Sequence, residues 1–427
     1  MKVFKQPSEK VLKSILSRPT PSFQDIESTV TEMFLDIKRM GDTAINKYTS
    51  MFDGVELQQI KVSEAEITEA SKSISPKLKT AIQQAKSNVE KFHRSQRMRS
   101  EKVAISEGVS CWQESRPIER VGLYIPGGTA PLFSSVIMLA VPAVLAGCEE
   151  IILCSPPSKS RNNTIAAEIL YTAQLCGVKN IYKIGGIQAI AAMTFGTETI
   201  PSVYKIFGPG NQYVTVAKQM AMNYGVSIDM PAGPSELMVF SDDTGNPSYI
   251  AADLLSQAEH GTDSQVILVT TSDKLVEEVR NEINIQIDEL PRKEIARKAL
   301  ENSKIIFVPG EKQALDIVNE YAPEHLIICS KNEDFFIKGL KNAGSVFLGN
   351  YTPESAGDYA SGTNHTLPTN GFSRAYSGVN LDSFIKKITF QKLTREGLES
   401  IGDTIEIMAA AEGLDAHKNA VSIRLNG

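Results

Sequence analysis

Hydrophobic residues near the start of the chain recur at the spacing of a helix. Within residues 22–41, four apolar side chains lie three or four positions apart and share one face: Ile26, Val30, Met33 and Ile37. Gly41 is a suitable end for this helix, and Ser63 and Ser75 are suitable caps for two more. His93 lies among polar neighbours near the end of the last of these helices, so we expect it at the surface.

From residue 121 the pattern changes to short apolar strands that alternate with helices. The expected strands are VGLYI, IILCS, NIYKI and VYKIF. This alternation is typical of a parallel sheet covered by helices. A second α/β region follows, and its expected strands are ELMVFS, QVILVTT, KIIFVP, HLIICS and SVFLG. Residues 380–427 are expected to form a mostly helical tail.

Three junctions between a strand and the next helix are rich in glycine. They are IPGGTAP at 125–131, IGGIQA at 184–189 and FGPGNQ at 207–212. Glycine lets backbone amides approach an anion at the N-terminus of a helix. None of the three matches the GxGxxG fingerprint of dinucleotide-binding folds. Phosphate binding and tight turns without a ligand both remain open at this point.

Composition narrows the class of protein. A chain of 427 residues is longer than one hydrophobic core usually supports, which favours more than one domain. With 22% charged and 42% hydrophobic residues it resembles soluble globular enzymes, and a net charge of −6 disfavours nucleic acid as a partner. No apolar run suits a membrane span or a signal peptide, so we expect a cytoplasmic protein without membrane contact. The five cysteines lack CxxC spacing, which argues against disulfides and thiolate zinc sites.

Histidine is scarce, and four of the five histidines lie in polar segments beside turns: His260, His325, His365 and His417. Gln257 and His260 would share one face in the last turn of a helix that begins at Asn246 and Pro247 and ends at Gly261. A pair at this spacing can bind a metal ion, although most such pairs are structural.

A carboxylate and an imidazole are adjacent at Glu324 and His325, where an apolar strand begins. This pair suits acid–base catalysis near neutral pH, although two polar residues in a plain helix-to-strand connection would look the same. Asp358 and His365 lie in the loop-like run ESAGDYASGTNHTLPT. Asp358 and the histidines could form an oxygen–nitrogen site for zinc or a similar divalent ion. The residues alone therefore predict a metal-dependent α/β enzyme.

Seven segments resemble the signature segments of the histidinol dehydrogenase family, in the order of that family. They are YIPGGTAPLFSSV, FGPGNQYV, GPSELMV, SQAEHGTDSQVIL, APEHL, ESAGDYASGTNHTLPT and AAAEGLDAHKNAV. These segments span nearly the whole chain. The resemblance implies the last steps of histidine biosynthesis, in which L-histidinol is oxidised through the aldehyde to L-histidine and two NAD molecules are reduced in succession.

The resemblance also implies roles for individual residues. One zinc ion per subunit would be bound by Gln257, His260, Asp358 and His417. Glu324 would activate water at the aldehyde stage, and His325 would remove the alcohol proton. The substrate would contact Ser235, Gln257, His260, His325, Asp358, His365, Glu412 and His417. NAD would contact Tyr124, Gln188 and Asn211, each in or near one of the glycine-rich junctions.

The implied fold has two incomplete, Rossmann-like parallel-sheet domains, a helical N-terminal segment and a mostly helical C-terminal tail. We expect an N-terminal arm at 1–22, an NAD-binding domain at 121–234 and a dimerisation tail at 380–427. Residues 23–120 and 235–379 would together form the α/β domain that carries the metal and catalytic residues. In a homodimer, the tail would complete the active site of the partner subunit.

Two alternatives remain from the residues. A zinc hydrolase could bind its metal through His260, Asp358 and His417 and use Glu324 to activate water, but it would leave the three glycine-rich junctions without a role. A non-catalytic protein of the same fold could bind histidinol or another imidazole ligand. Binding of NAD would distinguish a dehydrogenase from the hydrolase, and turnover would distinguish it from the non-catalytic protein.

Overall fold

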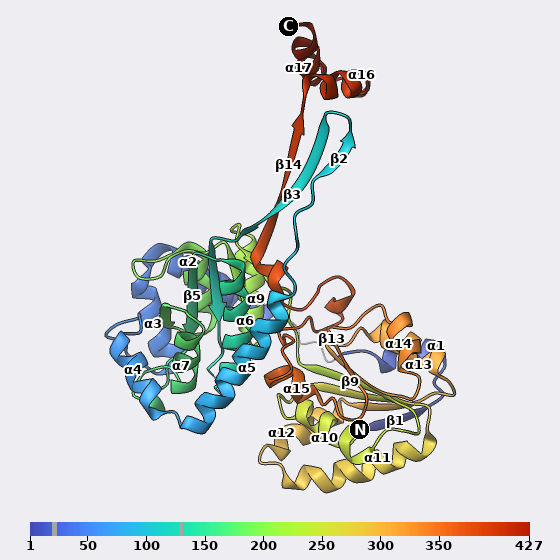
Figure 1. Cartoon of the computed structure of the whole chain (residues 1–427). Coiled ribbons are helices and arrows are strands. Elements are labelled where there is room, and N and C mark those ends of the chain that lie inside the picture. The colour runs from blue at the N-terminus through green and yellow to red at the C-terminus, as the bar shows by residue number, and fades with distance from the viewer. Residues whose placement is uncertain (19–23, 128–130) are drawn as a thin grey trace.

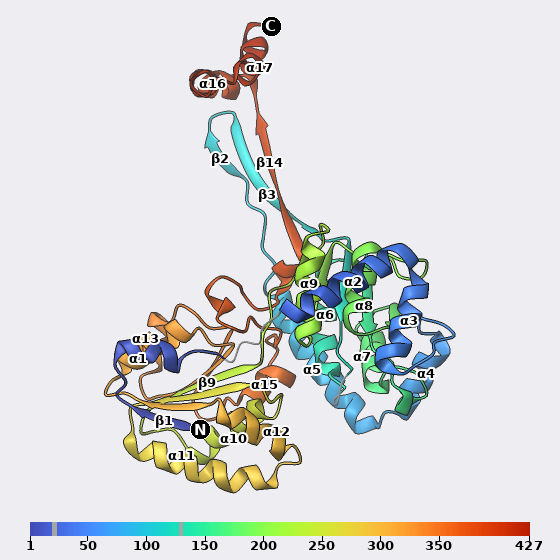
Figure 2. The ribbon, with the colours of Figure 1, turned by 180° about the vertical axis from the view of Figure 1, so that it is seen from behind.

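The computed structural model describes residues 1–18, 24–127 and 131–427. Within these ranges the chain forms two α/β bodies that lie side by side, and a slender arm that projects away from both (Figure 1). The view from behind shows the same three parts, with the C-terminus at the far end of the arm (Figure 2). The predicted α/β class with two parallel sheets is confirmed. None of the described helices combines the length and apolar character that crossing a membrane requires.

The first body is built on a parallel sheet with the strand order β6-β5-β4-β7-β8. Its strands are β4 (Arg120–Tyr124), β5 (Glu150–Ser155), β6 (Asn180–Lys183), β7 (Lys205–Phe207) and β8 (Ser227–Ile228). The four strands predicted for this region are therefore confirmed. Its helices are α2 (Gln24–Met40), α3 (Asp42–Asp53), α4 (Glu64–Ser73), α5 (Pro76–Arg94), α6 (Phe133–Ala146), α7 (Ala167–Leu175), α8 (Gly186–Phe195) and α9 (Gln212–Met222).

Helices α2 to α5 pack on the first sheet, and this differs from the expected grouping of residues 23–120 with 235–379. The apolar face predicted for α2 lies in one core with α8 and α9, and α4 and α5 share another core with α6 and α7. Ser63 and Ser75 cap α4 and α5 as predicted. The sequence of an amphipathic helix shows that its apolar face must be buried, but it does not show which sheet that face packs against.

His93 is buried, and the prediction of a surface position was wrong. Its ring bonds through Nδ1 to the carbonyl oxygen of Val89 at 2.9 Å, and Nε2 lies 3.3 Å from the Asn364 side-chain nitrogen. Asn364 also donates to the carbonyl oxygen of Met138 at 2.6 Å. The polar neighbours of His93 in sequence gave no sign of this contact, because Asn364 comes from the other body.

The second body contains a parallel sheet with the strand order β1-β11-β10-β9-β12-β13. Its strands are β1 (Lys2–Lys5), β9 (Glu236–Ser241), β10 (Gln265–Thr270), β11 (Lys304–Phe307), β12 (His325–Cys329) and β13 (Ser345–Leu348). The five strands predicted for this region are confirmed, and β1 adds an edge strand beside β11. Its helices are α1 (Glu9–Ile15), α10 (Pro247–Ala258), α11 (Asp273–Gln286), α12 (Lys293–Glu301), α13 (Glu311–Tyr321), α14 (Glu333–Gly339) and α15 (Glu354–Tyr359).

Short 3-10 helices occur at η1 (Lys159–Arg161), η2 (Ile287–Glu289), η3 (Phe372–Arg374) and η4 (Leu381–Phe384).

The arm is an antiparallel sheet of order β14-β3-β2 with two helices at its end. Its elements are β2 (Val103–Ser106), β3 (Val109–Pro117), β14 (Ile385–Leu393), α16 (Arg395–Ala411) and α17 (Asp415–Asn426). The expected helical tail thus begins with a strand that pairs with β3 over its whole length. The strand was missed because both faces of this narrow sheet are largely exposed, so its sequence lacks a clear alternation of apolar and polar residues.

Candidate functional site

A pocket of about 210 Å³ lies where the two bodies meet. The first body lines it with the start of α6 and the turn after β7, and the second body with residues around β12 and α15. Seven of the predicted site residues line this pocket: Ser235, Gln257, His260, Glu324, His325, Asp358 and His365. They come from separate parts of the sequence, so the fold gathers them in one place.

The two sheets contribute opposite ends to the pocket. The first sheet contributes the carboxyl end of β7, which is where parallel sheets usually bind ligands. The second sheet contributes its amino ends instead, because Ser235 precedes β9 and His325 is the first residue of β12. Parallel pairing of β9 with β12 brings these two strand starts together.

Glu324 and His325 are both oriented by the backbone of Glu236. The Glu236 amide donates to Oε2 of Glu324 at 2.8 Å. The Glu236 carbonyl oxygen lies 3.2 Å from Nδ1 of His325. When Nδ1 carries the proton for this bond, Nε2 is left as the proton acceptor that faces the pocket.

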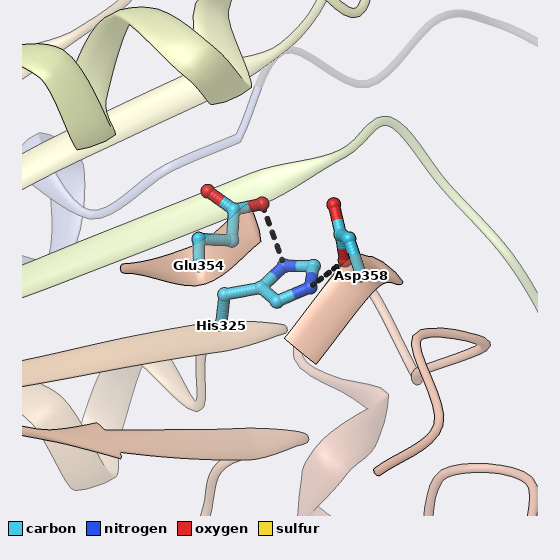
Figure 3. Close-up of side chains that lie close together, drawn as sticks. All are labelled: His325, Glu354 and Asp358. Carbon is cyan, nitrogen blue, oxygen red and sulfur yellow. Dashed lines mark ion pairs between the residues drawn. The ribbon is translucent and has the colours of Figure 1, made fainter. Parts of the chain in front are cut away.

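Carboxylates surround the His325 ring (Figure 3). Its Nδ1 lies 3.6 Å from Oε1 of Glu354, and its Nε2 lies 3.7 Å from Oδ1 of Asp358. Burial alone would lower the pKa of His325, but the charges of Glu354 and Glu324 and the contact with Asp358 raise it well above its usual value. Burial raises the pKa of Glu354 to about 8. Once the ring accepts a proton, the surrounding carboxylates therefore stabilise its positive charge.

Asp358 and His365 influence each other across the same pocket. Burial would raise the pKa of Asp358, but His325 and His365 hold it below its usual value. Burial lowers the pKa of His365 despite the nearby carboxylate. His365 bonds through Nδ1 to the backbone oxygen of Asp358 at 3.0 Å and through Nε2 to Oγ of Ser135 at 3.1 Å. Asp358 lies on the short helix α15 rather than on the loop that its sequence suggested.

The pocket has donor atoms that fit a divalent ion. Oε1 of Gln257 is buried and has no hydrogen-bond partner in the part of the chain that the structure describes. His260 and Asp358 line the same pocket, so three of the four expected ligands lie around one space. His260 lies just beyond α10, which ends at Ala258 and therefore earlier than predicted. An unsatisfied amide oxygen beside an imidazole and a carboxylate is a suitable donor set for zinc.

Glu412 and His417 lie on the arm and not at this pocket. Glu412 follows α16, His417 belongs to α17, and both are exposed. Both views place these helices at the far end of the arm. Within a single chain, these two residues are therefore separated from the predicted site residues that line the pocket.

The three expected NAD contacts lie at the glycine-rich junctions of the first body. Tyr124 ends β4, and its hydroxyl oxygen accepts a hydrogen bond from the Gly186 amide at 3.1 Å. Burial raises the pKa of Tyr124 to about 12, so it remains a neutral phenol. Gln188 is buried near the start of α8. Asn211 caps α9 and lines a second cavity of about 370 Å³ that shares Ser235 and His260 with the first. Residues 128–130 of the first junction lie outside the described residues.

A family model described as histidinol dehydrogenase matches residues 16–425. The chain belongs to the histidinol dehydrogenase family. A histidinol dehydrogenase from Bacteroides thetaiotaomicron is 57% identical and covers 100% of this chain and 99% of its own length. One from Haemophilus influenzae is 51% identical over 98% of this chain and 97% of its own. The crystal structure of histidinol dehydrogenase from Elizabethkingia anophelis has a TM-score of 0.98 at 55% identity, covering 100% of this chain and 98% of that one.

Membership of the histidinol dehydrogenase family makes the chain an oxidoreductase, as predicted. The structure also shows three polar residues at or beside the pocket that sequence reasoning missed. Glu354 lies beside His325, and Lys218 and Asp229 line the pocket. All three are polar and nearly or fully buried, but burial is not visible in the sequence.

A buried ion pair holds the glycine-rich turn after β7. Nζ of Lys218 lies 2.5 Å from Oδ1 of Asp229. The same two side chains bond to both polar groups of the Gly208 backbone, since Asp229 accepts from its amide and Lys218 donates to its carbonyl oxygen, each at 2.8 Å. Gly208 has a φ of +126°, and a Cβ there would lie 2.0 Å from the backbone oxygen of Tyr124. Only glycine therefore fits between these strands.

We expect Gly208→Ala to lower the free energy of unfolding by about 3 kcal/mol or more, because it adds a backbone clash to an unfavourable φ. Gly177→Ala is the matched control, since Gly177 also has a positive φ, +85°, but its Cβ would meet no described atom within 4 Å. The control should cost about 1 kcal/mol. Urea denaturation of both variants measures the difference, and equal losses would contradict the clash.

Proposed function

We propose that this chain oxidises L-histidinol through the aldehyde to L-histidine, with a zinc ion and NAD, in the last steps of histidine biosynthesis. The observation that carries the proposal is one pocket that gathers seven predicted site residues, lined by the glycine-rich turn after β7 and by Glu324 and Asp358 of the second body. The names of the relatives support the substrate. The cytoplasmic location stays a prediction from the sequence.

Gln257, His260 and Asp358 are the residues of this chain that would hold the zinc ion. Bound there, zinc would supply a fixed positive charge that orients the substrate, and NAD would supply the acceptor for hydride. Asn211, Gln188 and Tyr124 would hold NAD at the first body, whereas the three zinc ligands come from the second body. Ser235 and His365 would contact the substrate between them.

His325 and Glu324 divide the proton transfers in this proposal. His325 takes the proton of the substrate hydroxyl at Nε2 during the alcohol stage. Glu324 takes a proton from water during the aldehyde stage. Both side chains are nearly buried, which keeps other water away from the reacting carbon. Two successive oxidations at one carbon explain why the base and the water activator are adjacent in the chain.

The fourth zinc ligand, His417, and the substrate contact Glu412 would come from the partner subunit of a homodimer. Support comes from the end of the arm, where α16, α17 and the turn between them expose apolar side chains: Ile407, Met408, Leu414 and Ile423. Exposed apolar surface on a projecting element is typical of a surface that another protein covers. A partner body that receives this arm would bury the apolar side chains and bring Glu412 and His417 to the other pocket.

We expect about two NADH for each L-histidinol when the substrate is limiting and NAD is in excess, because the proposal requires two hydride transfers. The absorbance of NADH measures how much NADH is formed, and chromatography measures how much histidine is formed. Chelation should abolish turnover, and zinc should restore it. Manganese and cobalt are added separately for comparison, since similar ligands accept them.

Two outcomes would contradict parts of this proposal. One NADH per histidinol with accumulating aldehyde would contradict the second oxidation. No NADH from a folded, zinc-loaded protein would favour the zinc hydrolase or the non-catalytic binding protein. Calorimetry with NAD then tests the hydrolase, because a hydrolase has no use for the cofactor and should not bind it.

A further inference from the structure

The main chain of Glu236 contacts both proposed proton-transfer residues. Its amide holds a carboxylate oxygen of Glu324 at 2.8 Å, and its carbonyl oxygen faces Nδ1 of His325 at 3.2 Å. A shift of this one residue would therefore displace both side chains together. The position of Glu236 must be firmly held for the proposed reaction.

The side chain of Glu236 is a buried carboxylate, only 2% exposed. Arg18 binds it with two nitrogens: Nε contacts Oε1, and Nη2 lies 3.0 Å from Oε2. The Asn370 amide donates to Oε1 at 3.0 Å. The planar guanidinium matches both carboxylate oxygens at once, which fixes the direction as well as the charge of the side chain.

Arg18 also holds the segment that leads into Glu324. Its Nη2 donates to the carbonyl oxygen of Tyr321 at 2.7 Å, and its guanidinium carbon lies 3.9 Å from the centre of the Tyr321 ring. Tyr321 is fully buried and donates to Gln265 at 2.9 Å. The next residue, Ala322, has a φ of +54°, so the chain turns sharply just before Glu324. One guanidinium thus joins the start of β9 to the turn before β12.

We infer that Arg18 and Glu236 are positioning residues: the N-terminal segment, through this ion pair, sets the orientation of Glu324 and His325. The inference rests on the proposed function. Neither residue has a role as a zinc ligand in that proposal, and Glu236 acts through its backbone. Loss of the pair should therefore reduce the rate of the chemical steps more than the binding of histidinol or NAD.

Arg18→Lys is the mildest test, because lysine keeps the charge but cannot form two parallel hydrogen bonds. We expect it to lower kcat about tenfold, with both KM values changed less than about threefold. Arg18→Met should lower kcat about 100-fold, because it leaves the Glu236 carboxylate buried and unpaired. Adding Glu236→Gln to Arg18→Met removes that charge and should recover part of the lost kcat.

The matched control is Arg280→Met. Arg280 also forms an ion pair, with Glu277 at 3.0 Å, but both side chains are largely exposed on α11. Its kcat should equal that of the unchanged protein. Melting temperatures are measured for every variant, and kinetics are recorded well below the lowest of them, so that loss of folded protein is not mistaken for loss of rate.

A second measurement is chemical rescue of Arg18→Ala with guanidinium at concentrations far below those that unfold proteins. Rescue of kcat is expected for Arg18→Ala and not for Arg280→Ala. Unchanged kcat in folded Arg18→Lys and Arg18→Met, with only the melting temperature lowered, would overturn the inference. If Arg18→Met does not fold, the kcat of Arg18→Lys alone tests the inference. If the unchanged chain forms no NADH from histidinol, the proposed function fails and this inference falls with it.

Discussion

Glu324→Gln is expected to lower the rate of aldehyde oxidation by about 1000-fold, because an amide cannot take a proton from water. The replacement has nearly the same shape, and its oxygen can still accept the hydrogen bond from the Glu236 amide. Zinc retention and histidinol binding should therefore change little. Oxidation of the alcohol should be affected far less, since that stage uses His325 in the proposed mechanism.

The two stages can be measured separately by starting from L-histidinol or from L-histidinaldehyde. With histidinol, Glu324→Gln should form the first NADH and then stall. His325→Gln should show the reverse pattern and be impaired at the alcohol stage. Glu320→Gln is a suitable control, because Glu320 is an exposed carboxylate close by in the chain. Small and equal losses at both stages would contradict the division of roles.

His417→Asn is expected to abolish both zinc retention and turnover, and Asp358→Asn should do the same. If the arm serves the partner subunit, a mixed dimer of these two variants has one pocket in which both ligands are intact. Random mixing should then restore about one quarter of the unchanged activity and a corresponding fraction of bound zinc. If the arm serves its own subunit, every pocket is damaged and mixing restores nothing.

A second pair of variants provides the control for mixing. Gln257→Ala and Asp358→Asn both alter ligands in the second body, so each pocket of their mixed dimer lacks one ligand whichever way the arm reaches. No recovery is expected for this pair. Co-expression with two different affinity tags isolates the mixed dimers, and metal analysis gives a readout that does not depend on activity.

The sequence predicted the strands of both bodies except β1 and β8, because each predicted strand is a short apolar run between polar turns. Rare histidines beside carboxylates, together with the family resemblance, also indicated the candidate site, and the structure places seven of the predicted site residues around one pocket. Their individual roles stay predictions. The resemblance to a family was needed for Ser235, and also to interpret Gln257 as a metal ligand rather than as one member of a structural pair.

What the sequence could not show depends on contacts between distant segments. In the sequence, Arg18 and Glu236 are separated by the whole of the first body, and nothing near either residue indicates a buried ion pair. His93 was placed at the surface because its partner, Asn364, belongs to the other body. The strand β14 was missed because an exposed ribbon lacks the apolar alternation that identifies strands.

The pairing of β1 with β11 sets an order of events during synthesis. On the ribosome, the first body can fold from a continuous stretch of chain, but β1 emerges first and must wait for Lys304–Phe307 before it has its partner strand. Contacts over such a sequence separation form slowly, because a long loop must close first. The segment with Arg18 follows β1 and docks beside the same late-forming sheet. The earliest part of the chain to be made is thus among the last to reach its native place.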